Sequence, residues 1–148
     1  MEQLPYIDEH SIQIRATREE AWRALVSVLR TDLGGSTTLP LTRLLGVEPA
    51  QLRGDWRGEI RLGDTLPGFA VAETRSPERL ALHGEHRFSR YALVFELDAT
   101  DAAGCTLRAQ TWAEFPGNAG RAYRALVIGT RGHRVVVHRL LRKVARRV

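Results

Sequence analysis

Histidine, tyrosine and threonine side chains spaced along otherwise hydrophobic segments are the residues of this chain best suited to chemistry or ligand recognition. Histidine and tyrosine exchange protons, and all three types form hydrogen bonds. Hydrophobic periodicity, with a period of two in predicted strands and 3.6 in predicted helices, indicates that seven of them point inward: His10, His86, Tyr91, Thr111, Tyr123, Thr130 and His133. A buried polar group without a partner costs about 1–3 kcal/mol, so each should meet a protein group, a water molecule or a ligand. We therefore take them as the candidate lining of a ligand pocket.

The C-terminal segment carries three of these residues on one hydrophobic face at helical spacing. Tyr123, Thr130 and His133 share this face with Leu126, which we add to the candidate pocket. His133 has three interpretations: a histidine satisfied within the protein, a contact to a bound ligand, or a general acid or base. Trp22 lies on the hydrophobic stripe of an earlier helical segment and is either core or pocket wall.

The sequence lacks the usual catalytic and cofactor-binding motifs. It contains neither the Gly-x-x-x-x-Gly-Lys-Ser/Thr phosphate loop nor the Gly-x-Gly-x-x-Gly dinucleotide motif. Residues 34–38 lack the closing glycine of a nucleophile elbow, and a single cysteine, Cys105, excludes a site built from several thiolates. His83 and His86 resemble a metal pair, but residues three apart in a strand point to opposite faces of the sheet. We therefore expect no metal, no cofactor and no preassembled set of catalytic residues.

The positive charge of the chain is concentrated near its C-terminus. Nine of the 22 Lys and Arg residues, and none of the 17 acidic residues, follow Asn118. We predict that this basic run is the solvated face of a helix. The alternative is that its charge contacts an acidic partner, a nucleic-acid backbone or an anionic membrane surface. Ile128 and Val135 interrupt the basic face, so homodimerisation through this helix is a further alternative. No aromatic residues are interleaved with the arginines of residues 139–147, so we expect no nucleic-acid partner.

The elements that must position these side chains follow from hydrophobic periodicity. Residues 6–15 alternate as a half-buried strand. Thr17 and Glu20 form a capping box that begins an amphipathic helix. Residues 55–115 show short alternating segments separated by turn residues, which predicts an antiparallel meander. Residues 118–147 show helical periodicity without a proline, which predicts one helix about 45 Å long.

The order of these elements, with a short helical insertion over residues 39–47, resembles the SRPBCC superfamily. The resemblance is carried by the strand-to-helix entry at residues 12–22 and by residues 82–84, 91–97 and 129–134. This superfamily includes START lipid-binding domains, the birch pollen allergen family and bacterial polyketide cyclase/dehydrase-like proteins. The resemblance implies an α+β helix-grip fold, in which a curved antiparallel sheet wraps around a long C-terminal helix and encloses a hydrophobic pocket.

The length of the chain fits one domain, which we place over residues 1–148. No hydrophobic run reaches the roughly 18 residues of a membrane span, and the first residues do not form a signal segment, so we expect a cytoplasmic protein without integral membrane association. We hypothesise that it binds or carries a hydrophobic small molecule, such as a lipid, a polyketide or a similar metabolite, between sheet and helix. Two alternatives stay open: a polyketide cyclase/aromatase-like enzyme, and an interaction or dimerisation module that uses the basic C-terminal helix.

Overall fold

The computed structural model describes residues 4–34, 52–57, 59–100, 104–126 and 132–148. They form a six-stranded antiparallel sheet with the strand order β1-β6-β5-β4-β3-β2, so the first strand pairs with the last one. Three helices complete the described fold. The elements are β1 (Tyr6–Ile14), α1 (Arg18–Leu33), β2 (Thr65–Leu66), β3 (Phe69–Arg75), β4 (Arg79–His86), β5 (Ser89–Ala99), β6 (Cys105–Glu114), α3 (Gly117–Arg124) and α4 (Gly132–Arg147).

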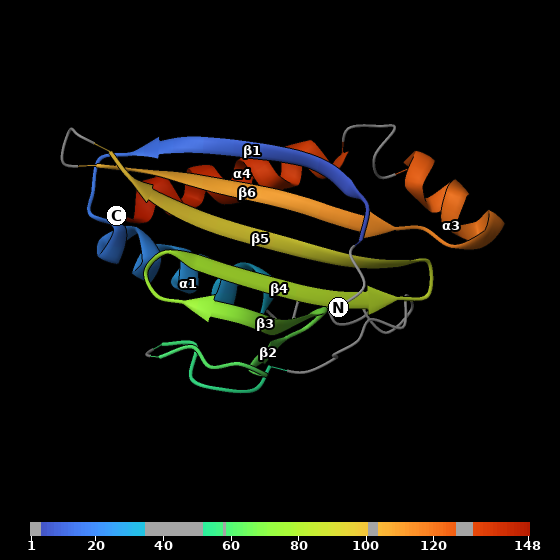
Figure 1. The fold of residues 1–148 in the computed structure, drawn as a ribbon, viewed down its shortest axis with the longest axis horizontal. Helices are drawn as coiled ribbons and strands as arrows, with labels where there is room; N and C mark the ends of the chain where they lie inside the picture. The colour runs from blue at the N-terminus through green and yellow to red at the C-terminus, as the bar shows by residue number, and fades with distance from the viewer. Residues whose placement is uncertain (1–3, 35–51, 58, 101–103, 127–131) are drawn as a thin grey trace.

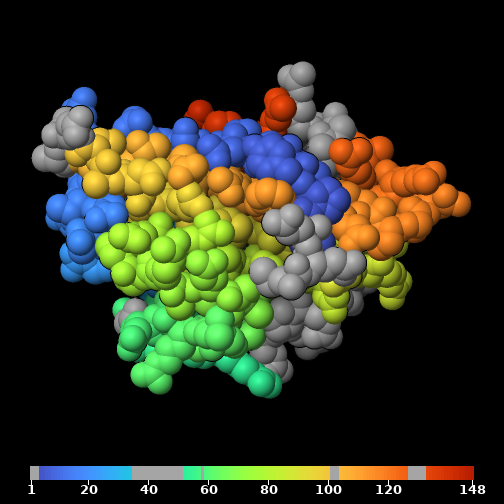
Figure 2. Space-filling model, viewed as in Figure 1, coloured from blue at the N-terminus to red at the C-terminus, as the bar shows by residue number. Residues whose placement is uncertain are grey.

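Helices α1 and α4 pack against one face of the sheet, whereas α3 lies beyond the strand ends (Figure 1). Viewed from the other face, the side chains of the strands cover much of the molecule, and α4, in red, is almost hidden behind them (Figure 2). The predicted α+β class is therefore confirmed. An internal pocket of this fold must lie between the sheet and the helices behind it.

The predicted N-terminal strand and capped helix are confirmed. Alternate residues of β1 turn inward, and the strand ends at the buried Ile14. The Thr17 hydroxyl accepts a hydrogen bond of 3.2 Å from the Glu20 amide, and the Glu20 carboxylate accepts one of 2.9 Å from the Thr17 amide. These two bonds satisfy amides at the helix start and fix where α1 begins. The buried stripe of α1 consists of Ala21, Trp22, Ala24, Leu25, Val26, Val28 and Leu29.

The predicted antiparallel meander forms between Phe69 and Glu114. Strands β3, β4, β5 and β6 pair in sequence order, each with the next strand along the chain. Hydrophobic side chains from their inner face enter the core, which includes Leu80, Leu82, Phe95, Leu97, Leu107 and Ala109. Their burial holds the sheet against the helices, at about 25 cal/mol for each Å² of hydrophobic surface removed from water.

The single helix predicted over residues 118–147 is corrected to two helices. Helix α3 ends at Arg124, and α4 begins at Gly132. Glycine in a helix interior costs about 1 kcal/mol relative to alanine, so a glycine is better tolerated at a helix start. Residues 127–131, which include the predicted pocket residue Thr130, lie outside the described residues, as does the predicted insertion at 39–47. The part of the predicted stripe that α4 buries is Val137, Leu140, Leu141 and Val144.

Candidate functional site

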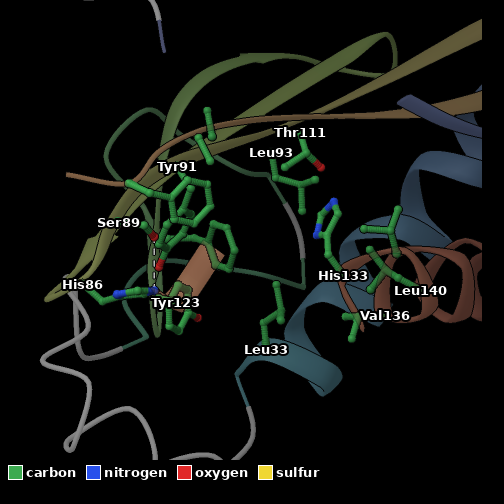
Figure 3. A pocket seen from close by; sticks show the side chains of 15 residues that line it. Leu33, His86, Ser89, Tyr91, Leu93, Thr111, Tyr123, His133, Val136 and Leu140 are labelled. Atoms are coloured by element: carbon green, nitrogen blue, oxygen red, sulfur yellow. Dashed lines mark hydrogen bonds between the residues drawn. The ribbon is translucent and has the colours of Figure 1, made fainter. Parts of the chain in front are cut away.

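A pocket of about 290 Å³ lies between the inner face of the sheet and helix α4 (Figure 3). Its walls are mostly hydrophobic: Leu33 comes from α1, Leu93 and Ala113 from the central strands, and Val137 and Leu140 from α4. This volume lies near the lower end of the range of about 300–1,000 Å³ that is typical of small-molecule sites. The pocket therefore suits a compact hydrophobic molecule.

One end of the pocket is an aromatic cluster. The ring centre of His86 lies 4.7 Å from that of Tyr123, and the ring centre of Tyr91 lies 5.3 Å from that of Phe69. Phe88 stacks on Tyr123 at 5.7 Å. These distances fall within the range of about 4.5–7 Å that aromatic pairs prefer. Through Tyr123, helix α3 contributes to the pocket although it lies beyond the strand ends.

The polar atoms of His86 are engaged within the protein. Its Nδ1 accepts a hydrogen bond of 3.0 Å from the backbone amide of Phe88, and its Nε2 lies 3.2 Å from Ser89 Oγ. Because Nδ1 accepts, the proton of the neutral ring is on Nε2, which donates to Ser89. Burial lowers the pKa of His86 and favours this neutral form. His83 lines a separate hollow on the opposite face of the sheet, as its spacing from His86 predicts.

Tyr91 is also satisfied by the protein. Its hydroxyl donates a hydrogen bond of 2.7 Å to the carbonyl oxygen of Gly68. Burial, followed by the nearby Tyr123 and Glu85, raises the pKa of Tyr91 well above its ordinary value. A hydroxyl with a raised pKa and an engaged hydrogen is a poor acid or base near neutral pH. Tyr91 therefore serves as pocket wall.

Thr111 is different, because it has an unsatisfied polar group. The residue is 8% exposed, and among the described residues its hydroxyl oxygen has no hydrogen-bond partner. Figure 3 shows this oxygen directed toward the imidazole of His133. An unsatisfied buried hydroxyl costs about 1–3 kcal/mol and marks a place where a ligand can supply the missing bond.

His133, in the first turn of α4, is held by a carboxylate of β1. Its Nε2 lies 3.2 Å from Asp8 Oδ1, and Nε2 of His10 lies 3.1 Å from Asp8 Oδ2. Burial alone would raise the pKa of Asp8, but the hydrogen bonds and charges of His10 and His133 outweigh it and lower the pKa. Asp8 is therefore ionised near neutral pH and accepts from both histidines. A histidine oriented by a carboxylate is an arrangement suited to general-base chemistry.

Five of the nine residues predicted to contact a ligand line this pocket: His86, Tyr91, Thr111, Tyr123 and His133. Trp22 lies in the core and is not part of the described lining. His10 is not part of the described lining either; it bonds to Asp8 and packs its ring 4.5 Å from that of His138. Leu126 lies past the end of α3, is 67% exposed and is not part of the described lining.

Asp8 is a site residue that the prediction lacks. It lies on the same face of β1 as His10, two residues earlier, and this spacing is the signal in the sequence that identifies it. Its pairing with His133 joins residues 125 positions apart, which local periodicity does not indicate.

The basic face of α4 is partly engaged within the protein. Lys143 Nζ lies 2.8 Å from Asp32 Oδ2 of α1, and Arg147 donates a hydrogen bond of 2.9 Å to Ser27 Oγ. Val135 is 56% exposed, and dimerisation through this face stays a prediction. Within the part of the chain that the structure describes, no helix is both long and hydrophobic enough to cross a membrane.

Comparison with known proteins gives matches among solved structures. No protein-family model matches the chain, and no curated protein matches it. A conserved protein from Geobacillus kaustophilus has a TM-score of 0.53 at 18% identity, over 93% of this chain and 91% of that one. Truncated norcoclaurine synthase from Thalictrum flavum has a TM-score of 0.56 at 11% identity, over 98% and 95%. Ara h 8.0201 has a TM-score of 0.52 at 10% identity, over 93% of each chain.

These similarities span nearly the whole chain at low sequence identity, so they concern the fold. They agree with the open antiparallel sheet, the helix between its first two strands and the C-terminal helix α4 on its inner face. The resemblance carried by residues 12–22 and 91–97 implied the same arrangement. This chain therefore has the α+β helix-grip fold.

Proposed function

We propose that this protein binds a compact hydrophobic molecule in the pocket between the sheet and α4. The observation that carries the proposal is the pocket itself, about 290 Å³ in volume, with mainly hydrophobic walls and an aromatic cluster at one end. A guest that fills it gains about 25 cal/mol for each Å² of hydrophobic surface removed from water. A lipid, a polyketide or a similar metabolite suits these walls. The simplest function of such a pocket is to carry its ligand without catalysing a reaction.

The uncharged fluorescent probe N-phenyl-1-naphthylamine tests this proposal. We expect one probe molecule to bind per chain, with an increase in fluorescence, and to be displaced by hydrophobic metabolites that fit the pocket. Native mass spectrometry of the protein purified from its own cells then identifies the natural ligand. A folded protein that binds no probe and carries no small molecule from its host would overturn the proposal.

Two matched variants locate the binding site. Ala113 lines the pocket, whereas Ala81 lines the hollow on the outer face of the sheet. Ala113→Phe fills the pocket, and we expect it to weaken probe binding about tenfold or more, which corresponds to roughly 1.4 kcal/mol. Ala81→Phe adds the same side chain on the other face and should leave the affinity close to that of the wild type. Equal effects of the two variants would show that the probe binds elsewhere.

A second candidate function, cyclisation of a polyketide-like substrate, is favoured by the pair formed by Asp8 and His133. His133 borders the pocket, and Asp8 orients its ring from 3.2 Å away. In this reaction His133 Nδ1 removes a proton from a carbon between two carbonyl groups, and the enolate carbon attacks another carbonyl carbon of the same chain. The resulting alkoxide takes the proton back from His133, so bonds and protons balance.

Turnover of a synthetic poly-β-ketone thioester tests this second candidate. General-base catalysis contributes about 10²–10⁴-fold, so His133→Gln should lower the rate by that factor. His138→Gln changes a histidine of the same helix that is not part of the described lining, and it should leave the rate unchanged. A wild-type rate no faster than the reaction without protein would exclude the cyclase and leave the binding function standing.

A further inference from the structure

The corner of the pocket where β1, β6 and α4 meet has a hydrogen-bonding capacity that indicates one class of ligand. Asp8 and Thr111 are register partners across β1 and β6, and His133 bonds to Asp8 over 3.2 Å. Figure 3 shows the hydroxyl oxygen of Thr111 facing the imidazole of His133. Two polar side chains therefore share one end of a cavity whose walls are mostly hydrophobic.

Asp8 determines which nitrogen of His133 carries the proton. An ionised carboxylate only accepts hydrogen bonds, so the hydrogen between Asp8 and His133 is on Nε2. His10 bonds to the second carboxylate oxygen over 3.1 Å and holds it in place. A neutral His133 then has a lone pair on Nδ1, and among the described residues no donor reaches this atom. Nδ1 is thus an oriented hydrogen-bond acceptor at the edge of the pocket.

Thr111 supplies the complementary group. It is more than nine-tenths buried, since 8% of the residue is exposed, and its hydroxyl has no partner among the described residues. Rotation about χ1 moves the hydroxyl between staggered positions, so it can turn toward a bound molecule. A ligand hydroxyl that donates to His133 can accept from Thr111 at the same time. An ether or carbonyl oxygen lacks the hydrogen that His133 Nδ1 requires.

We propose, on the basis of the binding function proposed above, that the ligand is a hydrophobic molecule bearing a hydroxyl group, as an alcohol, phenol or enol does. This hydroxyl lies between His133 and Thr111, and the hydrocarbon part extends toward the aromatic cluster. His86 and Tyr91, at that other end, use their polar atoms within the protein. Selectivity for the hydroxyl group therefore resides at the corner formed by His133 and Thr111.

Two ligands of nearly equal shape test this inference: 2-naphthol, which carries a hydroxyl, and 2-methylnaphthalene, which carries a methyl group in its place. The Kd of each is measured by calorimetry for the wild type, His133→Phe, Thr111→Val and, as a control on the same helix, His138→Phe. For each protein, the Kd of 2-methylnaphthalene is divided by the Kd of 2-naphthol. Comparing this ratio between wild type and variant cancels the difference in hydrophobicity between the two ligands. We expect His133→Phe to reduce the preference for 2-naphthol about tenfold, as the loss of one buried hydrogen bond predicts.

Thr111→Val, which keeps the shape of the side chain, should reduce the same preference severalfold, and His138→Phe should leave it unchanged. Circular dichroism establishes that each variant is folded, and Thr111→Val alone decides the question if His133→Phe does not fold. If the wild type binds both compounds and neither His133→Phe nor Thr111→Val alters the ratio of their Kd values, the hydroxyl proposal is overturned. The proposed binding function would still stand. Wild-type protein that binds neither compound would overturn both.

Discussion

Tyr91 donates a hydrogen bond of 2.7 Å to the carbonyl oxygen of Gly68, in the turn between β2 and β3. Gly68 has a φ of 86°, in the left-handed region that glycine adopts without steric cost. Gly84 lies directly against this contact, because a Cβ atom at position 84 would be 1.7 Å from the same carbonyl oxygen. These three residues together fix the Tyr91 ring in the pocket wall.

Tyr91→Phe removes the donor to the Gly68 carbonyl, and we expect the free energy of unfolding to fall by about 1–3 kcal/mol. Urea unfolding followed by circular dichroism measures this loss. Tyr123→Phe is the matched control, because the Tyr123 hydroxyl has no hydrogen-bond partner among the described residues. It should change the stability by less than about 0.5 kcal/mol. Equal losses in the two variants would contradict a structural role for the Tyr91 hydroxyl.

Local sequence patterns predict those parts of the fold whose causes are local. The capping box of Thr17 and Glu20 satisfies neighbouring amides, and it places the start of α1 correctly. Alternation within residues 55–115 predicts the meander because each strand pairs with its neighbour in sequence. The division of the C-terminal segment into α3 and α4 is not predictable in this way, since the hydrophobic period is the same for one helix or two.

Within the candidate site, too, local sequence patterns predict some residues, whereas other contacts depend on residues far apart in the sequence. Alternation identifies Tyr91 and Thr111 as inward-facing residues of their strands. The contact between Asp8 and His133 depends on where α4 packs against β1, which no local pattern records. Trp22 shows a further limit of periodicity, because a hydrophobic stripe has the same spacing whether it faces solid core or a cavity.

The charge state of His86 gives a prediction about pH. Burial lowers the pKa of His86 below its ordinary 6.5, so the unfolded chain takes up a proton more readily than the folded protein. The contribution of neutral His86 to stability is therefore complete above pH 6.5 and is lost as the pH falls through the folded pKa. In proton NMR, the Hε1 signal of His86, assigned by its absence in His86→Gln, should titrate with a midpoint below pH 6.5. A midpoint above that value would show that the ring is stabilised in its charged form.

Lowering the pH should also affect the free energy of unfolding of the wild type and of His86→Gln differently. Below pH 6.5 the wild type loses the contribution of neutral His86, whereas the glutamine variant has no such group to titrate. The difference in unfolding free energy between the two proteins should therefore shrink on acidification. If this difference in unfolding free energy grows on acidification instead, folding does not lower the pKa of His86.

Glu96 links two arginines on the outer face of the sheet, and this link should contribute to stability. Its carboxylate bonds to Arg79 of β4 and to Arg108 of β6, and its side chain is 21% exposed. Glu96→Gln weakens both pairs, and we expect a loss of about 1–2 kcal/mol in unfolding free energy that decreases at high salt. Glu59→Gln is the matched control, because Glu59 is 81% exposed and lies 3.8 Å from Arg61. Such solvated pairs contribute little, so an equally large loss in the control would contradict the importance of burial.

Gly84→Ala should disturb the pocket through the contact between Gly68 and Tyr91. The added methyl group would lie 1.7 Å from the Gly68 carbonyl oxygen and 2.7 Å from Tyr91 Cε2, so the backbone or the ring must move. Such overpacking typically costs about 1–3 kcal/mol, and the displaced Tyr91 ring should also weaken binding of the naphthylamine probe. In the Gly84→Ala background, Tyr91→Phe should then cost less than in the wild type, because the hydrogen bond it removes is already disrupted. Additive losses in the double variant would mean that Gly84 and Tyr91 act independently, with the tyrosine still bonded to Gly68.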